Sequence, residues 1–198
     1  MRRANRVLRA AQPQLVGRAM VFHPCGIQGA WLVDPTPHVD SRGRFMRAWC
    51  EHEFVSQGID FTPLQANMSL SLLKGTIRGL HYQSEPALEA KLVRCTRGVM
   101  FDVIVDLRPS SATYRAWHGE YLSADNGRMF FVPEGCAHGC QALEDVSEIH
   151  YLTSAVYSPN NSRGIRYDDP AIGIAWPLEI SAISDQDRNW PLLDPSEK

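Results

Sequence analysis

Lysine is scarce in this sequence, long apolar runs are missing, and neither sign of charge dominates. Lys74, Lys91 and Lys198 are the only lysines among 20 basic residues, so a lysine beside functional-looking residues is informative. No apolar run approaches the roughly 20 residues that a membrane-spanning helix needs. The formal net charge of -2 offers no bulk attraction for nucleic acid, and 44% hydrophobic with 21% charged residues is typical of soluble globular proteins.

The cysteines are odd in number and scattered along the chain. A chain of 198 residues can bury a core large enough not to need the disulfides that are typical of small secreted domains. The cysteines therefore favour a reducing compartment, and we expect a cytoplasmic protein. They are Cys25, Cys50, Cys95, Cys136 and Cys140.

The length favours one domain, because two domains within 198 residues would each have a marginal core. Residues 1–19 contain five arginines and no acidic residue, a pattern that suits a targeting segment or a nucleic-acid-binding arm. They lack the apolar stretch of a signal peptide, and the sequence becomes typical of a folded protein at Met20. We expect residues 1–19 to be a disordered extension and residues 20–198 to form one domain.

Short runs of β-branched and aromatic residues alternate with turn residues from Trp31 onward. In residues 99–108, apolar side chains occupy every second position, and Asp102, Asp106 and Arg108 lie between them. This period of two predicts a strand with one face in the core and the other partly in water. Further strands are predicted at 91–97, 117–123, 128–133, 140–144 and 148–157, and short helices at 50–57 and 185–190. An all-β chain of this kind forms a sandwich, a barrel or a double-sheet jelly roll.

Two histidines lie in motifs that resemble those of the cupin superfamily. His81 stands six residues after Gly75, and Pro133-Glu-Gly-Cys-Ala-His138 has the Pro-x-Gly-x-x-His spacing of the second cupin motif. The resemblance implies a double-sheet jelly roll with few helices. In metal-binding cupins another histidine follows two residues after the first, but Gln83 stands there. An amide is a poor transition-metal ligand, so we expect a pocket without metal.

Cys136, His138 and Cys140 raise the separate possibility of a zinc site, because side chains at this spacing share one face of an extended strand. Structural zinc sites usually include a second ligand pair, and no further cysteine pair lies nearby in the sequence. We expect these cysteines to be buried as small hydrophobic residues.

Several ordered motifs lie between Gly26 and Leu193. They include Asp40-Ser-Arg-Gly-Arg-Phe45, Ile77-Arg-Gly-Leu-His-Tyr-Gln83 and Ser184-Asp-Gln-Asp187, with others at 65–69, 91–95, 101–108, 132–139 and 164–177. Together they resemble the dTDP-4-dehydrorhamnose 3,5-epimerase family. Each motif alone is weak, whereas their number and order within one domain make the resemblance specific.

The resemblance implies an isomerase that inverts C3, C5 or both of a nucleotide-linked, most often dTDP-linked, 4-keto-6-deoxyhexose in deoxysugar biosynthesis. Both carbons adjoin the C4 carbonyl, so removal of either proton gives an enolate that can be reprotonated on the opposite face. The reaction needs a base, an acid and a group that stabilises the enolate oxygen. It only moves protons, so we expect no cofactor.

The resemblance also assigns roles to individual residues. His81 is the expected base with Asp187 as its carboxylate partner, Lys91 stabilises the keto oxygen, and Tyr151 is the acid. Each has a plainer interpretation: His81 as a hydrogen-bonded core histidine, Lys91 as a solvated lysine, and Tyr151 as an ordinary strand aromatic. Tyr157 is the residue most easily mistaken for Tyr151.

A further set of residues matches family positions that bind the nucleotide, its diphosphate or the sugar. Arginine suits this task because its planar fork grips phosphate oxygens in pairs. For His138 the alternative is a packing role, and Phe45 and Trp176 can stack on a base or fill the core. The expected binding residues are Arg42, Phe45, Gln65, Asn67, Arg78 and His138.

Two departures from the family pattern leave the substrate open: Arg47 replaces a frequent glutamate, and Cys140 replaces a frequent phenylalanine. A reversed charge near the substrate entrance alters which ligand can approach. The alternatives are a mono-epimerase or isomerase for another sugar nucleotide, and a non-catalytic cupin that binds sugar nucleotides.

The resemblance also implies a homodimer in which an N-terminal strand extends the partner's sheet and covers its edge. In such a dimer, Arg42 or Phe45 would complete the neighbour's pocket.

Overall fold

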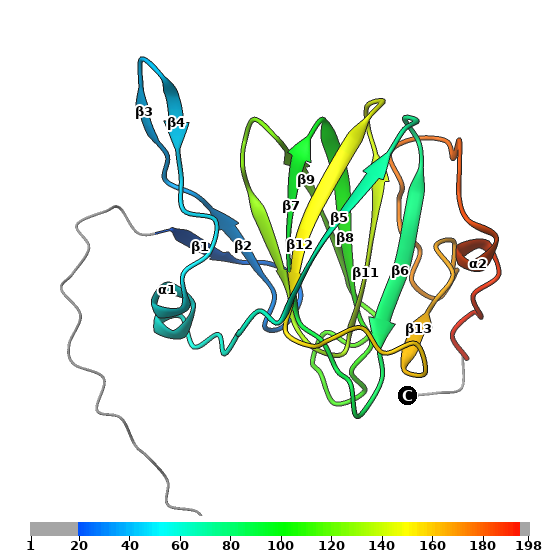
Figure 1. Cartoon of the computed structure of the whole chain (residues 1–198). Coiled ribbons are helices and arrows are strands. Elements are labelled where there is room, and N and C mark those ends of the chain that lie inside the picture. The colour runs from blue at the N-terminus through cyan, green and yellow to red at the C-terminus, as the bar shows by residue number, and fades with distance from the viewer. Residues whose placement is uncertain (1–19, 195–198) are drawn as a thin grey trace, which may run out of the picture.

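The structure, a computed structural model, describes residues 20–194. Two antiparallel sheets face each other and form a flattened barrel (Figure 1). This confirms the all-β, double-sheet jelly roll. The extension predicted for residues 1–19 lies outside the described residues, and no helix within residues 20–194 is long and apolar enough to cross a membrane.

The two sheets contain eleven strands in an order that brings distant segments together. The six-stranded sheet runs β1 (Val21–Pro24), β2 (Trp31–Asp34), β10 (Met129–Val132), β7 (Lys91–Arg97), β12 (Ser147–Thr153) and β5 (Gln65–Ser71). The five-stranded sheet runs β13 (Ser162–Gly164), β6 (Ile77–Gln83), β11 (Cys136–Ala142), β8 (Val99–Asp106) and β9 (Trp117–Ser123).

The predicted strands at 91–97 and 117–123 coincide with β7 and β9. The strand predicted at 140–144 is instead β11, which begins at Cys136. Its residues have little intrinsic preference for strands, but β11 pairs with β6 on one side and β8 on the other. Pairing on both sides therefore overrides local propensity there.

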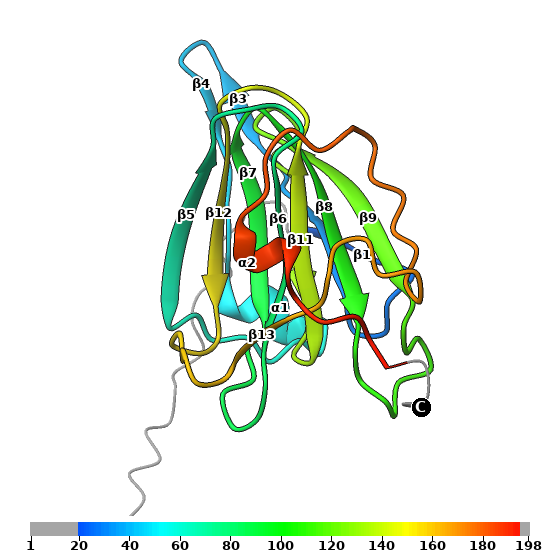
Figure 2. The ribbon, with the colours of Figure 1, turned by 90° about the vertical axis from the view of Figure 1, so that its right-hand side faces the viewer.

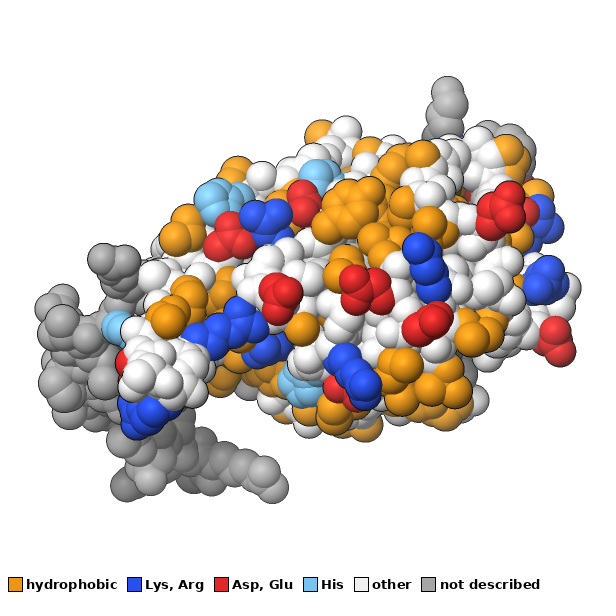
Figure 3. Space-filling view, turned by 90° about the horizontal axis from the view of Figure 1, so that it is seen from above, with side chains coloured by type: hydrophobic (Ala, Val, Ile, Leu, Met, Phe, Trp, Pro, Cys, Tyr) orange, Lys and Arg blue, Asp and Glu red, His pale blue; other side chains and the backbone are white. Residues whose placement is uncertain are grey.

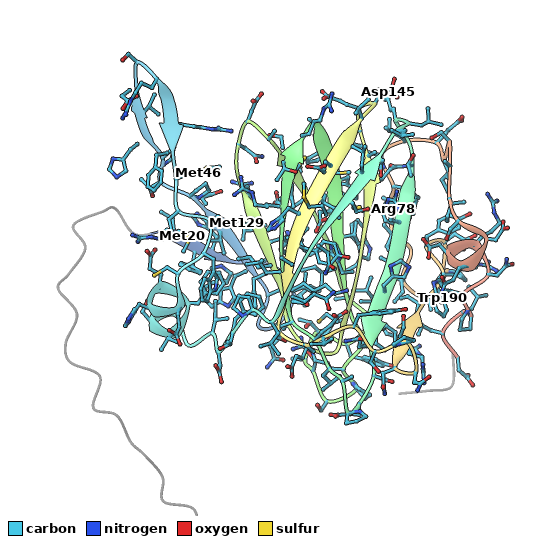
Figure 4. The ribbon with its side chains drawn as sticks, viewed as in Figure 1. Met20, Met46, Arg78, Met129, Asp145 and Trp190 are labelled. Atoms are coloured by element: carbon cyan, nitrogen blue, oxygen red, sulfur yellow. The ribbon has the colours of Figure 1, made fainter. Side chains whose placement is uncertain are left out.

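The barrel interior is filled at one side by apolar side chains from both sheets. Along β10, Phe130 and Val132 point inward to this core, whereas Met129 and Phe131 point outward. The outward pair packs against α1 (Glu51–Ser56) through Phe54, which is fully buried. Met20 and Met129 meet in the same outer layer (Figure 4).

The C-terminal segment covers the outer face of the five-stranded sheet, with α2 (Asp185–Arg188) lying over it (Figure 2). Phe101, Val103 and Val105 of β8 pack against this segment, and Asp102 and Asp106 on the opposite face are 0% exposed. The prediction that one face of β8 is partly in water is therefore wrong. A covering segment distant in sequence buries one face, and the barrel interior buries the other.

A projecting hairpin and an edge strand are the two least paired parts of the sheets. Strands β3 (His38–Asp40) and β4 (Gly43–Phe45) form a hairpin that projects from the molecule (Figure 1). Strand β5 pairs with β12 alone, so no hydrogen-bond ladder joins it to β6 within the described residues. At the end where β5 turns into β6, hydrophobic side chains lie in patches between charged ones (Figure 3). The exposed Leu72 and Leu73 belong to that turn.

Candidate active site

A cavity with two adjoining chambers occupies the side of the barrel between β5 and β6. The upper chamber, lined by Ser69, Arg78, His138 and Cys140 among others, measures about 520 Å³. The lower chamber, about 400 Å³, is lined among others by Gln65, Asn67, Glu89 and Tyr157. Four residues line both chambers and mark their junction: His81, Lys91, Tyr151 and Gln186.

His81 on β6 lies 2.6 Å from the carboxylate of Asp187 on α2, measured from Nε2 to Oδ1. The two residues are 106 positions apart in the sequence. The imidazole is 41% exposed, whereas the aspartate side chain is 7% exposed. The histidine therefore faces the cavity and the carboxylate lies behind it.

Short local features place Asp187 there. The side chain of Ser184 caps α2 by accepting a hydrogen bond from the backbone N–H of Asp187 at 3.0 Å. Gly79, with φ of +123°, donates its N–H to Asp187 Oδ2, and a Cβ at Gly79 would lie 2.6 Å from Gly139. Only glycine fits this conformation and this close approach of β6 to β11. Trp190, which lies beside α2 (Figure 4), donates its indole N–H to Asp187 Oδ1 at 3.3 Å.

These contacts determine the charge of Asp187. Burial opposes its ionisation, but hydrogen bonds from His81, Gly79 and Trp190 outweigh burial and hold the pKa of Asp187 below its ordinary value. An ionised carboxylate accepts the Nε2 proton of His81. The other ring nitrogen, Nδ1, then carries the lone pair that a general base requires.

Lys91 and Tyr151 reach the same junction from the six-stranded sheet. Lys91 Nζ donates to the backbone oxygen of His81 at 3.2 Å and forms an ion pair with Glu89 at 3.0 Å. The lysine side chain is only 7% exposed, so the interpretation as a solvated lysine does not hold. Burial is the main cause that raises the pKa of Tyr151, which keeps its phenol protonated at neutral pH.

A second histidine–aspartate pair lies beside the first. His138 on β11 is the register partner of His81 on β6, and its Nε2 lies 2.9 and 3.0 Å from the two oxygens of Asp102. Both side chains are buried, at 9% and 0% exposure. His138 lines the upper chamber and is held in place by a carboxylate that the solvent does not reach.

Other predicted binding residues are also on the cavity wall. Arg78 lines the upper chamber, and its guanidinium is held by Ser71 Oγ at 3.1 Å and by the Leu70 carbonyl at 2.8 Å. Gln65 and Asn67 line the lower chamber and bond to each other at 2.9 Å.

The structure does not bring Arg42 and Phe45 to this cavity. Both lie on the β3–β4 hairpin, where Arg42 pairs with Asp40 at 2.6 Å and Phe45 is 74% exposed. Arg47 pairs with Glu53 of α1 and is also absent from the residues that line the two chambers. Trp176 packs in the outer layer and donates to the Tyr167 carbonyl, so it fills core.

The cavity wall offers no group of three or more histidine, cysteine or acidic side chains placed for a metal ion, nor does the rest of residues 20–194. The Gln83 amide donates to the Ala87 carbonyl and accepts from the Ser158 N–H, so it is fully used by the backbone. Cys136 and Cys140 belong to the interior core as expected, and burial raises the pKa of the Cys136 thiol to about 12.

Sequence reasoning did not identify Glu89, Asp102 and Trp190 as parts of this site. The signal for Asp102 was an acid within an otherwise apolar strand, which we interpreted as solvent-facing. Glu89 lies two residues before Lys91, so the two side chains share one face of the extended chain. That spacing next to a rare lysine was a signal that could have been used.

Known proteins resemble this chain along most of its length. The sequence profile described as dTDP-4-dehydrorhamnose 3,5-epimerase matches residues 24–195. A dTDP-4-dehydrorhamnose 3,5-epimerase from Methanothermobacter thermautotrophicus is 45% identical over 175 residues, covering 87% of this chain and 94% of that protein. A dTDP-4-dehydrorhamnose 3-epimerase from Streptomyces niveus is 37% identical and covers 88% of this chain and 84% of that protein.

A solved structure also matches. The crystal structure of dTDP-4-dehydrorhamnose 3,5-epimerase from Bacillus anthracis, with TDP and PPi bound, has a TM-score of 0.86 and 37% sequence identity. The match covers 88% of this chain and 100% of that one.

Proposed function

This chain belongs to the dTDP-4-dehydrorhamnose 3,5-epimerase family, and we propose that it inverts C3, C5 or both of a dTDP-linked 4-keto-6-deoxyhexose with His81 as base. One observation carries the proposal. His81 enters the junction of the chambers from the five-stranded sheet, and Tyr151 enters it from the opposite, six-stranded sheet. A sugar ring held between the sheets presents opposite faces to these two groups.

The steps follow from that arrangement. Nδ1 of His81 removes the proton from the carbon beside the ketone, and Asp187 stabilises the imidazolium that forms. Negative charge develops on the keto oxygen, where the buried Lys91 ammonium stabilises it more strongly than it would in water. Tyr151 then protonates the same carbon from the other face. The enolate carbon is a stronger base than a phenolate, so this transfer is downhill.

The two chambers suit a substrate with two parts. The sugar lies at the junction, and Arg78, Gln65 and Asn67 are the expected contacts to the nucleotide, its diphosphate or the sugar. His138 positions the sugar from the upper chamber. The TDP bound to the Bacillus anthracis enzyme supports the nucleotide assignment.

Solvent-deuterium exchange tests the proposal. Incubation with dTDP-4-keto-6-deoxyglucose in D₂O should place deuterium at C3, C5 or both, followed by proton NMR. Binding of the substrate without exchange at either carbon would contradict it.

A mono-epimerase is the second candidate, favoured by the similarity to the Streptomyces niveus 3-epimerase. The same experiment separates the two, because deuterium at one carbon only, with the other proton retained over long incubation, identifies a mono-epimerase.

A homodimer accounts for the hairpin residues that lie outside their own chain's cavity. The hairpin exposes Val39 and Phe45 at 75% and 74%, and the edge strand β5 exposes Met68 at 66%. In the proposed dimer, the hairpin covers the partner's sheet and brings Arg42 and Phe45 to the partner's pocket.

The cytoplasm is the proposed compartment of this protein. Its five cysteines are all unpaired, as is usual in a reducing compartment.

Complementation tests this shared site. Coexpression of His81→Asn chains with chains carrying Arg42→Ala and Phe45→Ala should restore about a quarter of wild-type activity, because mixed dimers form one intact site. The matched control combines His81→Asn with Asp187→Asn, which damage the same cavity and should restore none. A chain that sediments only as a 22.2 kDa monomer at micromolar concentration would contradict the dimer.

A further inference from the structure

Glu89 is a buried carboxylate at the edge of the reaction site. It lies two residues before the first residue of β7, and its side chain is 11% exposed in the ion pair with Lys91. Glu89, Lys91 and Tyr151 all line the lower chamber. The ion pair therefore faces the cavity in which the sugar reacts.

Glu89 restricts where the Lys91 ammonium can lie. An ammonium has three N–H donors. One is directed at the Glu89 carboxylate at 3.0 Å, and another at the His81 carbonyl at 3.2 Å. Because two of the N–H bonds are held by these partners, the direction of the third N–H is set by the protein. This third N–H can donate to a keto oxygen in the cavity. A flexible lysine without Glu89 would have to be ordered by the substrate itself.

Glu89 also acts on Tyr151 through its charge. Burial comes first among the causes that raise the pKa of Tyr151, and the negative charge of Glu89 raises it further, while Arg78 lowers it. The acid must keep its proton until the enolate forms, so a nearby carboxylate favours the reactive form. The titratable or charged side chains that line the cavity with Tyr151 come from several elements. They are Glu89 before β7, Lys91 on β7, Arg78, His81 and Tyr82 on β6, His138 and Cys140 on β11, Tyr157 after β12, and Asp187 on α2.

We propose that Glu89 is a positioning residue for the epimerisation, which holds Lys91 against the keto oxygen and keeps negative charge beside Tyr151. This inference rests on the proposed function, because it assigns Glu89 a task in that reaction. A purely structural ion pair would affect folding but neither the geometry of the enolate-stabilising lysine nor the titration of the acid.

Glu89→Gln removes the charge and keeps the size of the side chain. We expect kcat for deuterium exchange to fall about tenfold or more with little change in KM, because the loss concerns the transition state. We also expect the basic limb of the pH–kcat profile to move to lower pH, because Tyr151 loses its negative neighbour. The matched control is Glu148→Gln on β12, whose side chain bonds to Thr96. This control should leave the profile unchanged.

Two further measurements keep the inference testable independently of activity and folding. Ultraviolet titration of Tyr151 in the ligand-free protein, as wild type minus Tyr151→Phe, should give a lower pKa in the Glu89→Gln background. Glu89→Asp retains the charge but withdraws the carboxylate by one methylene, so it should lower kcat and keep the basic limb.

The outcomes are distinguishable. Wild-type chains that never exchange deuterium overturn the proposed function, whereas the tyrosine titration still tests the charge effect of Glu89. Unchanged kcat in Glu89→Asp overturns the positioning of Lys91, and an unchanged Tyr151 titration in Glu89→Gln overturns the effect on the acid.

Discussion

The cavity holds two histidine–aspartate pairs with similar distances between ring nitrogen and carboxylate. The pairs differ in their exposure to solvent and in the elements that supply the carboxylates. His81 and Asp187 lie 2.6 Å apart, but the imidazole is 41% exposed and its carboxylate comes from the C-terminal segment. His138 and Asp102 lie 2.9 Å apart on neighbouring strands of one sheet, and both are buried. The His81 imidazole is exposed enough to react with a substrate, whereas the buried His138 is suited only to hold the substrate in position. The difference teaches that a short contact between histidine and aspartate does not by itself define a catalytic base.

Replacement of the two histidines gives the largest expected contrast. His81→Asn should slow exchange about 10⁴-fold, or about 5 kcal/mol, because it removes the base. His138→Asn should cost only about tenfold in rate, because it loosens the sugar without removing a reacting group. Single-turnover exchange measured by NMR compares them. Equal losses would show that both histidines transfer protons.

Loss of the buried Asp102 carboxylate should lower the free energy of unfolding. Asp102→Asn breaks a fully buried pair, and we expect the free energy of unfolding to fall by about 3 kcal/mol. Urea denaturation measures it, with Asp187→Asn as the comparison, for which we expect a smaller loss because its partner is half in water. The contrast fails if Asp187→Asn is the less stable variant.

Loss of the Asp187 carboxylate should lower the rate of epimerisation. In Asp187→Asn the amide no longer fixes the Nε2 proton, so we expect kcat to fall about 100-fold, or about 2.7 kcal/mol, with KM little changed. Steady-state kinetics at saturating substrate measure this change. A KM effect without a kcat effect would reassign Asp187 to substrate binding.

The same variant gives an acid-stability test. The pKa of Asp187 lies below its ordinary value of 3.8 in the folded protein, so its contacts stabilise the fold fully above that value. The contribution is lost as pH falls through the lower, folded pKa. The stability difference between wild type and Asp187→Asn should thus be constant near neutral pH and shrink below about pH 4. A difference that grows toward acid would contradict this.

The smallest effect should come from the cap of α2. Ser184→Ala removes the hydrogen bond that starts the helix, at a cost of about 1 kcal/mol to the docking of that segment. Deuterium exchange into the substrate should slow a few-fold, whereas the NMR signals of His138 should be the same as in the wild type. Ser181→Ala, in the same segment but bonded to the Lys74 carbonyl, serves as the control.

The sequence predicted the elements whose patterns are local. Strands β7 and β9 and the two short helices follow from propensity and period. The face of β8 was misjudged because burial there depends on residues 165–193, which no local pattern connects to it. The pairing of His81 with Asp187 came from resemblance alone, since 106 residues separate them.

The roles of buried charges were least predictable. Asp102 and Glu89 were missed because a sequence does not tell which acids lose their contact with water. Arg42 and Phe45 were recognised by motif, yet their own chain does not bring them to its cavity. A motif identifies the residue but does not show which cavity the residue serves.

The position of Asp187 on α2 has a consequence for heat tolerance. A four-residue helix laid over the outside of a sheet can detach in a fluctuation that leaves both sheets intact. We expect warming to separate the carboxylate of Asp187 from the imidazole of His81 before the barrel melts. We therefore expect this segment, and not the barrel, to set the highest temperature at which the protein is active, so that strengthening the barrel alone would leave that temperature unchanged.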